Sequence, residues 1–516
     1  MRVFLPGALA AAVLAAQPQH PGAGLFVIWY NSEKDASLFF RQPYLKGGQV
    51  VLQWADVEPA PGRYDFSSLD RELAAIRKLG WRATVQINGN RKPAWLFETV
   101  PSVPAKLSPQ VRNSEGTLMY WHPNHRGAYV AMIEALGRRL RDSPDRAAIL
   151  GLRMNFNAFG TEHLTVPKEY ASVERWRIPP GVAAEPFSAA ARFEYERAVV
   201  GAHLRAFEGT VRIFVRNNIP REIEEACRGR FDAGALSWFH TSSEAEPRSG
   251  GTERQYQRFH EDCRSGRTTC YAEPWASAWG DHGGVRDDRW CSPPQWFYWR
   301  ALFDLHNGVS HIALYASDLR VAVDGTYRGE AFPAYRAEFR AAADFAANYA
   351  GYHALPESSP GAWIAFRENH VVRAANNIPE QRRKLALFTS DYTFLMERLP
   401  GDRSRGVDVV NIGPEEQRYG AWARILPPGE TLRLRPDSRF VASLGGRPVE
   451  IRAVYFDEPP AEFSIRAGTT VRRIRPAGTR RWQTAAFSGI TLAGEIEVRA
   501  GGAPVTLHMV EVLRGE

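Results

Sequence analysis

The most restrictive feature of this sequence is a regular alternation of short apolar runs and amphipathic stretches, from about residue 24 to residue 350. The apolar runs predict buried strands, and the amphipathic stretches predict helices. Repeated strand–helix units imply a parallel sheet covered by helices, because each crossover returns the chain to the same end of the sheet. This part of the chain is therefore predicted to have an α/β fold.

The number of units distinguishes a closed barrel from an open sheet. Eight runs are predicted as strands: 24–30, 49–54, 81–88, 148–157, 210–217, 232–240, 268–273 and 311–317. Helices are predicted at 67–80, 129–141, about 187–208, 293–308 and 334–351. Eight units predict a (β/α)8 TIM barrel, whereas a doubly wound sheet would carry a Gly-rich turn after its first strand. The segment NSEKDASLFF has no such turn, so we expect a barrel over 24–352.

The pattern changes after about residue 355. Short β-prone runs such as TLRLR, PVEIRAVYF and EIEVRAG alternate with Gly- and Pro-containing turns, a pattern typical of antiparallel sheets. We predict a connecting segment over 353–404 and a jelly-roll-like β-sandwich over 405–516. Two roles remain open for this sandwich: a carbohydrate-binding module, or a brace packed against the barrel.

The first residues resemble an export signal. Arg2 precedes an apolar stretch from Val3 to Ala16, which predicts a signal peptide over 1–16 and a secreted or periplasmic protein. A retained membrane anchor is the alternative, although the stretch is short for a bilayer span. No later segment has 18 uninterrupted apolar residues, so we expect no integral membrane segment after signal removal.

The four cysteines bear on disulfides and metal sites, and the net charge bears on nucleic-acid binding. An even cysteine count in an exported chain favours disulfides, with three pairings open; one hypothesis joins Cys270 to Cys291, which would brace the loop after Glu273. The spacing of the cysteines matches no zinc site, and no motif implies a metal or other cofactor. The net charge of +8 is spread along the chain without a block of consecutive basic residues, which argues against nucleic-acid binding.

Two glutamates stand where a barrel places its catalytic groups, at the carboxyl ends of strands. Glu162 lies just past the fourth predicted strand and Glu273 ends the seventh. The two-residue alternation puts Tyr271 and Glu273 on the same face. Paired carboxylates about 5–5.5 Å apart perform retaining glycoside hydrolysis, and a separation of about 6.5–9.5 Å is typical of inverting enzymes. For each glutamate the alternative is an ordinary surface or salt-bridged acid.

The segment VVLQWADVEPAPGRYDFSSLDRELAAIRKLGWRATVQI, with its W-x-x-x-EP-x-PG-x-Y-D-F pattern, resembles clan A glycoside hydrolases. It is most similar to the bacterial β-galactosidase/β-glucanase branch, and NRKPAWL resembles the P-x-W after strand three there. The resemblance implies that Glu162 is the acid/base and Glu273 the nucleophile. In that clan an Asn precedes the acid/base; here Thr161 stands there, and Asn155 or Asn157 is the alternative contact for the sugar 2-hydroxyl.

Aromatic and polar side chains near these strand ends are candidates for contacts with an oligo- or polysaccharide substrate, since sugars stack on rings and buried hydroxyls need polar partners. The candidates are Trp54, Asp56, Asn88, Asn90, Asn155, Asn157, His240, Tyr271, Trp275, Trp279 and Tyr315. For each aromatic residue the alternative is core packing. The sequence thus predicts a secreted retaining β-glycosidase; the alternative is a non-catalytic glycan-binding protein on a decayed barrel.

Overall fold

The structure is a computed structural model that describes residues 22–28, 39, 42–217, 219–232, 234–240, 253–274, 276–280, 291–367, 391–407 and 412–515, without the side chains of 240 and 253–257. The predicted signal peptide lies outside these residues. Within them, no helix combines the length and the apolar character needed to cross a membrane.

The N-terminal part is a closed barrel of eight parallel strands, which confirms the predicted TIM-barrel fold. Each strand pairs with its predicted neighbour, and the first strand closes against the last. The strands are β1 (Gly24–Ile28), β2 (Leu45–Gln53), β3 (Arg82–Asn88), β6 (Ile149–Arg153), β7 (Ile213–Arg216), β8 (Leu236–His240), β9 (Cys270–Ala272) and β10 (His311–Tyr315).

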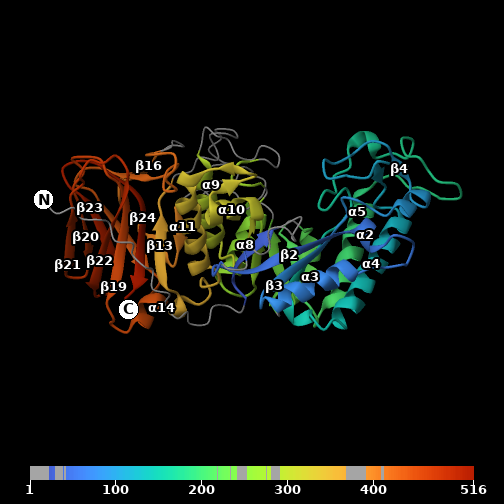
Figure 1. Cartoon of the computed structure of the whole chain (residues 1–516), viewed down its shortest axis with the longest axis horizontal. Helices are drawn as coiled ribbons and strands as arrows, with labels where there is room; N and C mark the ends of the chain where they lie inside the picture. The colour runs from blue at the N-terminus through green and yellow to red at the C-terminus, as the bar shows by residue number, and fades with distance from the viewer. Residues whose placement is uncertain are drawn as a thin grey trace.

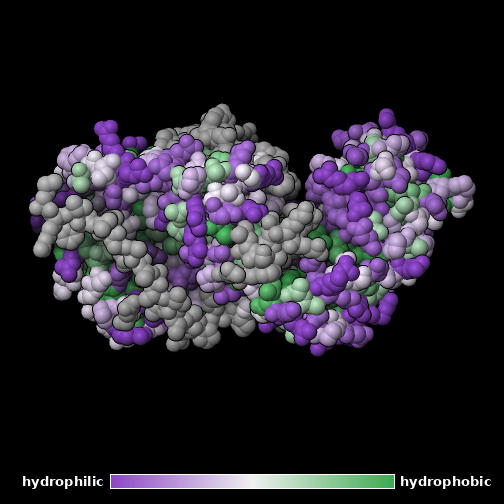
Figure 2. Space-filling model, viewed as in Figure 1, coloured by the Kyte–Doolittle hydropathy of each residue, from purple (hydrophilic) through white to green (hydrophobic). Residues whose placement is uncertain are grey.

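Helices follow the strands around the barrel (Figure 1). They are α2 (Trp54–Val57), α3 (Ser67–Lys78), α4 (Pro123–Arg141), α5 (Ala189–Phe207), α6 (Arg221–Ala226), α7 (Arg228–Asp232), α8 (Glu253–Arg264), α9 (Pro293–His306), α10 (Ala316–Asp324) and α11 (Pro333–Tyr349). The loops contain two short antiparallel strand pairs. They are β4 (Ser102–Val103) with β5 (Thr117–Leu118), and β11 (Thr326–Tyr327) with β12 (Glu330–Ala331). In Figure 2, hydrophilic side chains cover much of the surface around α4, α5 and β4.

Large side chains fill the interior of the barrel. Phe214, Phe239 and Tyr271 are fully buried, and their rings pack at centroid distances of 5.3 Å. Gly151 on β6 makes room for this layer, because a Cβ at that position would collide with the Phe214 ring. The barrel is therefore a packed core and not a pore, and only its rim is available for chemistry.

The C-terminal part consists of two antiparallel sheets, which confirms the predicted β-sandwich. One sheet contains β13 (Gly361–Ala365), β14 (Tyr392–Phe394), β16 (Arg405–Gly406), β17 (Arg424–Leu426), β19 (Val449–Phe456), β22 (Trp482–Ile490) and β24 (Val505–Arg514). The other contains β15 (Met396–Arg398), β18 (Thr431–Pro436), β20 (Phe463–Ala467), β21 (Thr470–Ile474) and β23 (Ile496–Ala500), and α14 (Ser438–Leu444) follows β18.

The sandwich begins earlier than the sequence boundary suggests. Strands β13, β14 and β15 fall within 353–404, which was expected to be a connecting segment, and β13 pairs along its whole length with β24 near the end of the chain. The polar composition of 368–384 hid the apolar strands on either side of it. The sheet thus joins segments that lie about 150 residues apart in sequence.

Helix α9 lies between the barrel and the sandwich, and all 14 of its residues are buried. The indole nitrogen of Trp299 donates to the carbonyl of Gly420 (2.8 Å), and the ring of His508 on β24 packs on the rings of Trp299 and Tyr298. A helix that is buried along its whole length is explained by such a position, because both of its faces are covered.

The disulfide hypothesis is wrong. The bond joins Cys263, at the end of α8, to Cys270 at the start of β9, and the buried residues Cys291 and Cys227 take no part in it. The real partners are seven residues apart, because the chain turns directly from α8 into β9. Cys291 instead precedes α9 by one residue and is buried there.

We expect acid to destabilise the fold through His508. Burial, and then the charge of Arg418, lower the pKa of His508 to about 3, from about 6.5 in an unfolded chain. Its contribution to the free energy of unfolding is therefore complete above pH ~6.5 and is lost as the pH falls toward 3, by at most about 1.4 kcal/mol per pH unit. Urea denaturation of wild type and His508→Gln between pH 7.5 and 4 measures this slope. The free energy of unfolding of the variant should fall less steeply than that of wild type as the pH is lowered. Equal slopes of the two proteins against pH would contradict the assignment to His508. The difference between the two proteins at pH 7.5 measures the packing lost in the substitution and is subtracted.

Candidate functional site

The two predicted glutamates lie at the same end of the barrel. Glu273 directly follows β9, and Glu162 lies in the turn that follows β6. Gln49 on β2 donates from Nε2 both to the Tyr271 hydroxyl (3.2 Å) and to Oε2 of Glu273 (2.8 Å). Tyr271 and Glu273 therefore share the inward face of the strand, as the alternation predicts.

A single guanidinium group links the two glutamates. Arg153, the last residue of β6, donates through Nη1 to Oε1 of Glu273 and through Nη2 to Oε1 of Glu162 (2.6 Å). Nη1 also donates to Gln86 Oε1 on β3 (2.9 Å), and the guanidinium carbon lies 4.2 Å above the Phe239 ring. The guanidinium thus occupies the space between the two carboxylates, directly above the packed interior of the barrel.

Glu162 is held as a carboxylate by two arginines. Arg216, at the end of β7, donates to Oε2 (2.9 Å), while Arg153 binds Oε1, and the Glu162 side chain is only 5% exposed. Burial raises the pKa of Glu162, but the charges and hydrogen bonds of Arg216 and Arg153 outweigh burial, and the net pKa is lowered. A general acid needs the opposite shift.

The turn that carries Glu162 folds back over the strand. The amide of Asn157 donates to the carbonyl of Thr161 (3.0 Å), and Asn157 itself has a φ of 50°. The side-chain oxygen of Gln110 accepts from the amides of Thr161 (2.8 Å) and Glu162 (3.2 Å). Because the turn returns the chain toward the barrel axis, Glu162 reaches Arg153 although nine residues separate them.

The asparagines at the end of β3 and just after β6 mainly support the backbone. Asn157 uses its whole amide: Oδ1 accepts from the Gly89 amide, and Nδ2 donates to the carbonyl of Ile87 and the hydroxyl of Tyr129. Asn155 donates from Nδ2 to the carbonyl of Ile87 and to Oδ1 of Asn88, and its own Oδ1 is buried without a hydrogen-bond partner. Of the two alternatives to the missing Asn, only Asn155 retains an acceptor.

Asn90 lies at the rim. Its Nδ2 donates to the carbonyl of Gln110 (3.0 Å), and its Oδ1 accepts from the Thr161 hydroxyl (3.3 Å). Asn90 is partly exposed, so its contacts tie the loop after β3 to the loop that carries Glu162.

Three of the predicted aromatic contacts are core residues. Trp54 is fully buried and donates from Nε1 to Glu58 (2.8 Å), Tyr271 is fully buried, and Tyr315 is 8% exposed and belongs to the barrel interior. Burial raises the pKa of Tyr271 further above its usual range. For these residues the core-packing alternative holds.

The remaining candidates are scattered. The Trp279 ring stacks on the Tyr327 ring (3.8 Å) within an aromatic cluster beside α11, and Asp56 forms an ion pair with Arg91 (2.6 Å) at the surface. Trp275 and the side chain of His240 lie outside the described residues. The structure therefore brings together Glu162 and Glu273, but not the predicted stacking platforms.

The residues that complete this site were not predicted. Arg153, Arg216, Gln49 and Gln86 supply the contacts to the two glutamates. A usable signal was present in the sequence, since Arg153 and Gln86 are polar residues inside otherwise apolar strands. Among the described residues, no group of three or more His, Cys, Asp or Glu side chains could hold a metal ion.

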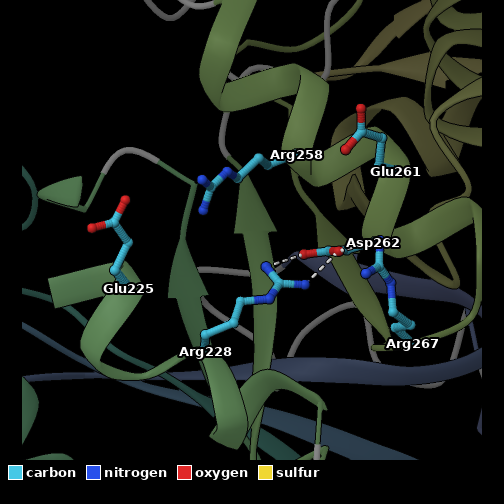
Figure 3. A pocket seen from close by; sticks show the side chains of 6 residues that line it. All are labelled: Glu225, Arg228, Arg258, Glu261, Asp262 and Arg267. Atoms are coloured by element: carbon cyan, nitrogen blue, oxygen red, sulfur yellow. Dashed lines mark hydrogen bonds and ion pairs between the residues drawn. The ribbon is translucent and has the colours of Figure 1, made fainter. Parts of the chain in front are cut away.

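A charged cavity of about 300 Å³ lies elsewhere, on the outer side of β8 (Figure 3). Arg228 binds Asp262 through two hydrogen bonds (2.7 and 2.9 Å), and Asp262 also accepts from the Trp238 indole of β8 (2.8 Å). The lining residues are Glu225, Arg228, Arg258, Glu261, Asp262 and Arg267. Since these belong to α6, α7, α8 and the segment before β9, the cavity is separate from the two glutamates.

Comparison with known families bears on the strands that hold this site. Residues 40–155 match the family Glyco_hydro_42, described as Beta-galactosidase. The match confirms the resemblance to that branch over β2, β3 and β6, and it includes Arg153, Gln49 and Gln86. It ends before Glu162 and Glu273. No curated protein sequence matches the chain significantly.

Several solved structures are weakly similar to part of this chain. The catalytic domain of β-amylase from Paenibacillus polymyxa has a TM-score of 0.36 and 11% identity, over 56% of this chain and 91% of that one. The β-galactosidase from Rahnella sp. R3 has a TM-score of 0.37 and 13% identity, over 64% and 57%. Xylanase B from Clostridium stercorarium F9 has a TM-score of 0.31 and 13% identity, over 57% and 86%. These scores are low, and the fold rests on the strand pairing described above.

We expect Arg153→Met to lower the free energy of unfolding by about 3–5 kcal/mol, because it leaves the buried carboxylate of Glu162 and the partly buried carboxylate of Glu273 without their shared cation. Urea denaturation at pH 7.5 measures the loss. The matched control is the triple variant Arg153→Met, Glu162→Gln, Glu273→Gln, which contains no uncompensated charge at these three positions. It should be more stable than Arg153→Met alone; equal stability of the two would contradict the electrostatic explanation.

Proposed function

We propose that this chain is a retaining glycosidase of the β-galactosidase kind, with Glu273 as nucleophile and Glu162 as acid/base. The observation that carries the proposal is the meeting of Glu162 and Glu273 at the carboxyl ends of β6 and β9, joined through Arg153. The family match over 40–155 supports the class of enzyme and the sugar. The substrate is a β-linked oligo- or polysaccharide.

In this mechanism Glu273 attacks the anomeric carbon as a carboxylate, while Glu162 protonates the departing oxygen and later removes a proton from the attacking water. Arg153 donates a hydrogen bond directly to Glu273. Glu162 must carry a proton for the first step, and its lowered pKa restricts that form to acidic solution. The proposal therefore includes an acidic pH optimum.

A second candidate function is glycan binding without cleavage, and the position of Arg153 favours it. The guanidinium stands between the two carboxylates, where the reacting sugar must lie for both glutamates to reach one glycosidic bond. The glycosidase proposal thus requires Arg153 to release at least one carboxylate when substrate enters. A binding protein requires no such movement.

We also propose that the protein acts in the periplasm or outside the cell, with Arg2 and the apolar stretch to Ala16 as support. N-terminal sequencing of protein recovered from the culture medium and from the periplasm tests this proposal. A mature chain that begins after Ala15 or Ala16 agrees with it, and an uncleaved N-terminus in the cytoplasm contradicts it.

Hydrolysis of aryl β-galactosides and β-galactan tests the two-glutamate mechanism. Glu162→Gln and Glu273→Gln should each lower kcat/KM by at least about a thousandfold, since each removes a reacting group. Glu58→Gln is the matched control, because Glu58 is buried near the same rim but its carboxylate bonds Trp54, Tyr64 and the turn at Gly62. Circular dichroism verifies folding.

Each result separates the alternatives. Wild-type activity that persists in either glutamate variant rules out the assigned residues. Binding of galactan by a wild type that cleaves nothing supports the second candidate. Retention of the β-anomer in the first product, observed by NMR, supports the retaining mechanism, and inversion contradicts it.

The pH dependence tests the role of Glu162. Arg216→Gln removes one of the two cations that lower its pKa, so the pKa of Glu162 should rise. If Glu162 is the acid, the basic limb of the pH profile of kcat/KM moves to higher pH, because Glu162 stays protonated up to a higher pH. Arg221→Gln, which alters an exposed arginine paired with Glu225, should leave the limb unchanged. A limb that stays or moves down in Arg216→Gln would exclude Glu162 as the acid.

A further inference from the structure

The sandwich carries a run of arginines that the proposed reaction does not use. Between Thr470 and Trp482 the sequence contains five arginines, no acidic residue and no aromatic residue. We call these five the arginine ridge: Arg472, Arg473, Arg475, Arg480 and Arg481. All five are exposed. Such a density of one charge on a short exposed segment indicates attraction for a polyanion.

The ridge lies on an open edge of the molecule. Strand β21, which holds Arg472 and Arg473, is the last strand of its five-stranded sheet and pairs with β20 on one side only. Figure 1 places β21 at the end of the sandwich farthest from α9 and the barrel. No described strand covers the outer edge of β21, so an extended polymer has access to it.

Three of the five guanidinium groups are available. Arg481 forms an ion pair with Glu416 (2.8 Å), and Arg475 lies 3.7 Å from Glu462. The side chains of Arg472, Arg473 and Arg480 have no hydrogen bond or ion pair within the part of the chain that the structure describes. The ridge therefore retains positive charge that its surroundings do not neutralise.

The backbone beneath the ridge is fixed. Arg480 has a φ of 53°, and its amide donates to the carbonyl of Asp457 (2.9 Å), while the Asp457 amide donates to the carbonyl of Arg481 (3.0 Å). The Asp457 carboxylate accepts from the amides of Gly478 (3.1 Å) and Thr479 (2.8 Å). A non-glycine residue keeps such a conformation only where surrounding bonds impose it, so the loop presents Arg480 from a set position.

We propose that the arginine ridge binds a carboxylate-bearing polysaccharide. Guanidinium groups pair with carboxylates through two parallel hydrogen bonds. Successive residues of a strand point to opposite faces, so Arg472 and Arg473 flank the open edge of β21 on its two sides, within reach of a polymer that follows this edge. The ridge offers no aromatic ring on which a neutral sugar could stack. The choice of a polysaccharide over other polyanions rests on the proposed glycosidase function.

Isothermal titration calorimetry of the full chain, at 50 and 200 mM salt, tests this proposal. Polygalacturonate is the anionic probe, and dextran is the neutral polysaccharide used for comparison. The ridge variant is Arg472→Ser, Arg473→Ser, Arg480→Ser. The matched control, Arg63→Ser, Arg141→Ser, Arg405→Ser, removes the same charge from exposed arginines elsewhere. We expect wild type and control to bind polygalacturonate but not dextran, more weakly at 200 mM salt, and the ridge variant to bind at least roughly tenfold more weakly.

Other outcomes overturn the proposal. Equal binding by the ridge variant and the control would assign the effect to net charge alone. Absence of polygalacturonate binding, or tighter binding to single-stranded DNA or to phosphatidylserine vesicles, would exclude the carboxylated polysaccharide as the partner. Aryl galactoside hydrolysis should be equal in all three proteins. Because the binding measurement needs no turnover, loss of the proposed catalytic function would be seen separately, in the wild-type hydrolysis assay.

Discussion

The guanidinium of Arg153 organises the rim of the barrel. It donates to side chains that follow β6 and β9 and to Gln86 on β3, and it covers the Phe239 ring of β8. Through Glu162 it is also coupled to Arg216 on β7. Five strands are thus connected through one ion-pair network, and the network lies directly on the apolar interior. Removing Arg153 takes away the cation that both glutamates share, and breaking such a network is costly.

The same network sets opposite demands for stability and for catalysis. Arg153 pairs with both glutamates at once, whereas a retaining mechanism needs one of them protonated. The carboxyl group of Glu162, with a second arginine on its other oxygen, is the more strongly held of the two. The position of the proton on this pair, more than the identity of the fold, decides between a hydrolase and a binding protein.

The architecture was readable from the sequence because it depends on local periodicity. Each of the eight barrel strands lies within or overlaps its predicted range, since buried parallel strands form distinct apolar runs. The strand ends then placed Glu162 and Glu273 at one rim. Arg153 was not predicted to join them, because a side-chain contact across 120 residues leaves no periodic signal.

Individual side chains were harder to assign than strands. Trp54 and Tyr271 are aromatic residues near the rim, and the sequence alone does not separate a ring that faces the cleft from one that is buried beside it. Both are fully buried. The cysteines show the same limit: the spacing of seven residues between Cys263 and Cys270 closes a turn that the residue pattern does not reveal.

The complete burial of α9 has a consequence for how the two parts of the chain depend on each other. A helix of the barrel that uses Trp299 and Tyr298 to contact the sandwich belongs to both hydrophobic cores at once. Barrel and sandwich are therefore coupled into one cooperative unit, and neither is an exchangeable module. A catalytic barrel cut free of its partner would expose an aromatic helix face to water and would be prone to self-association.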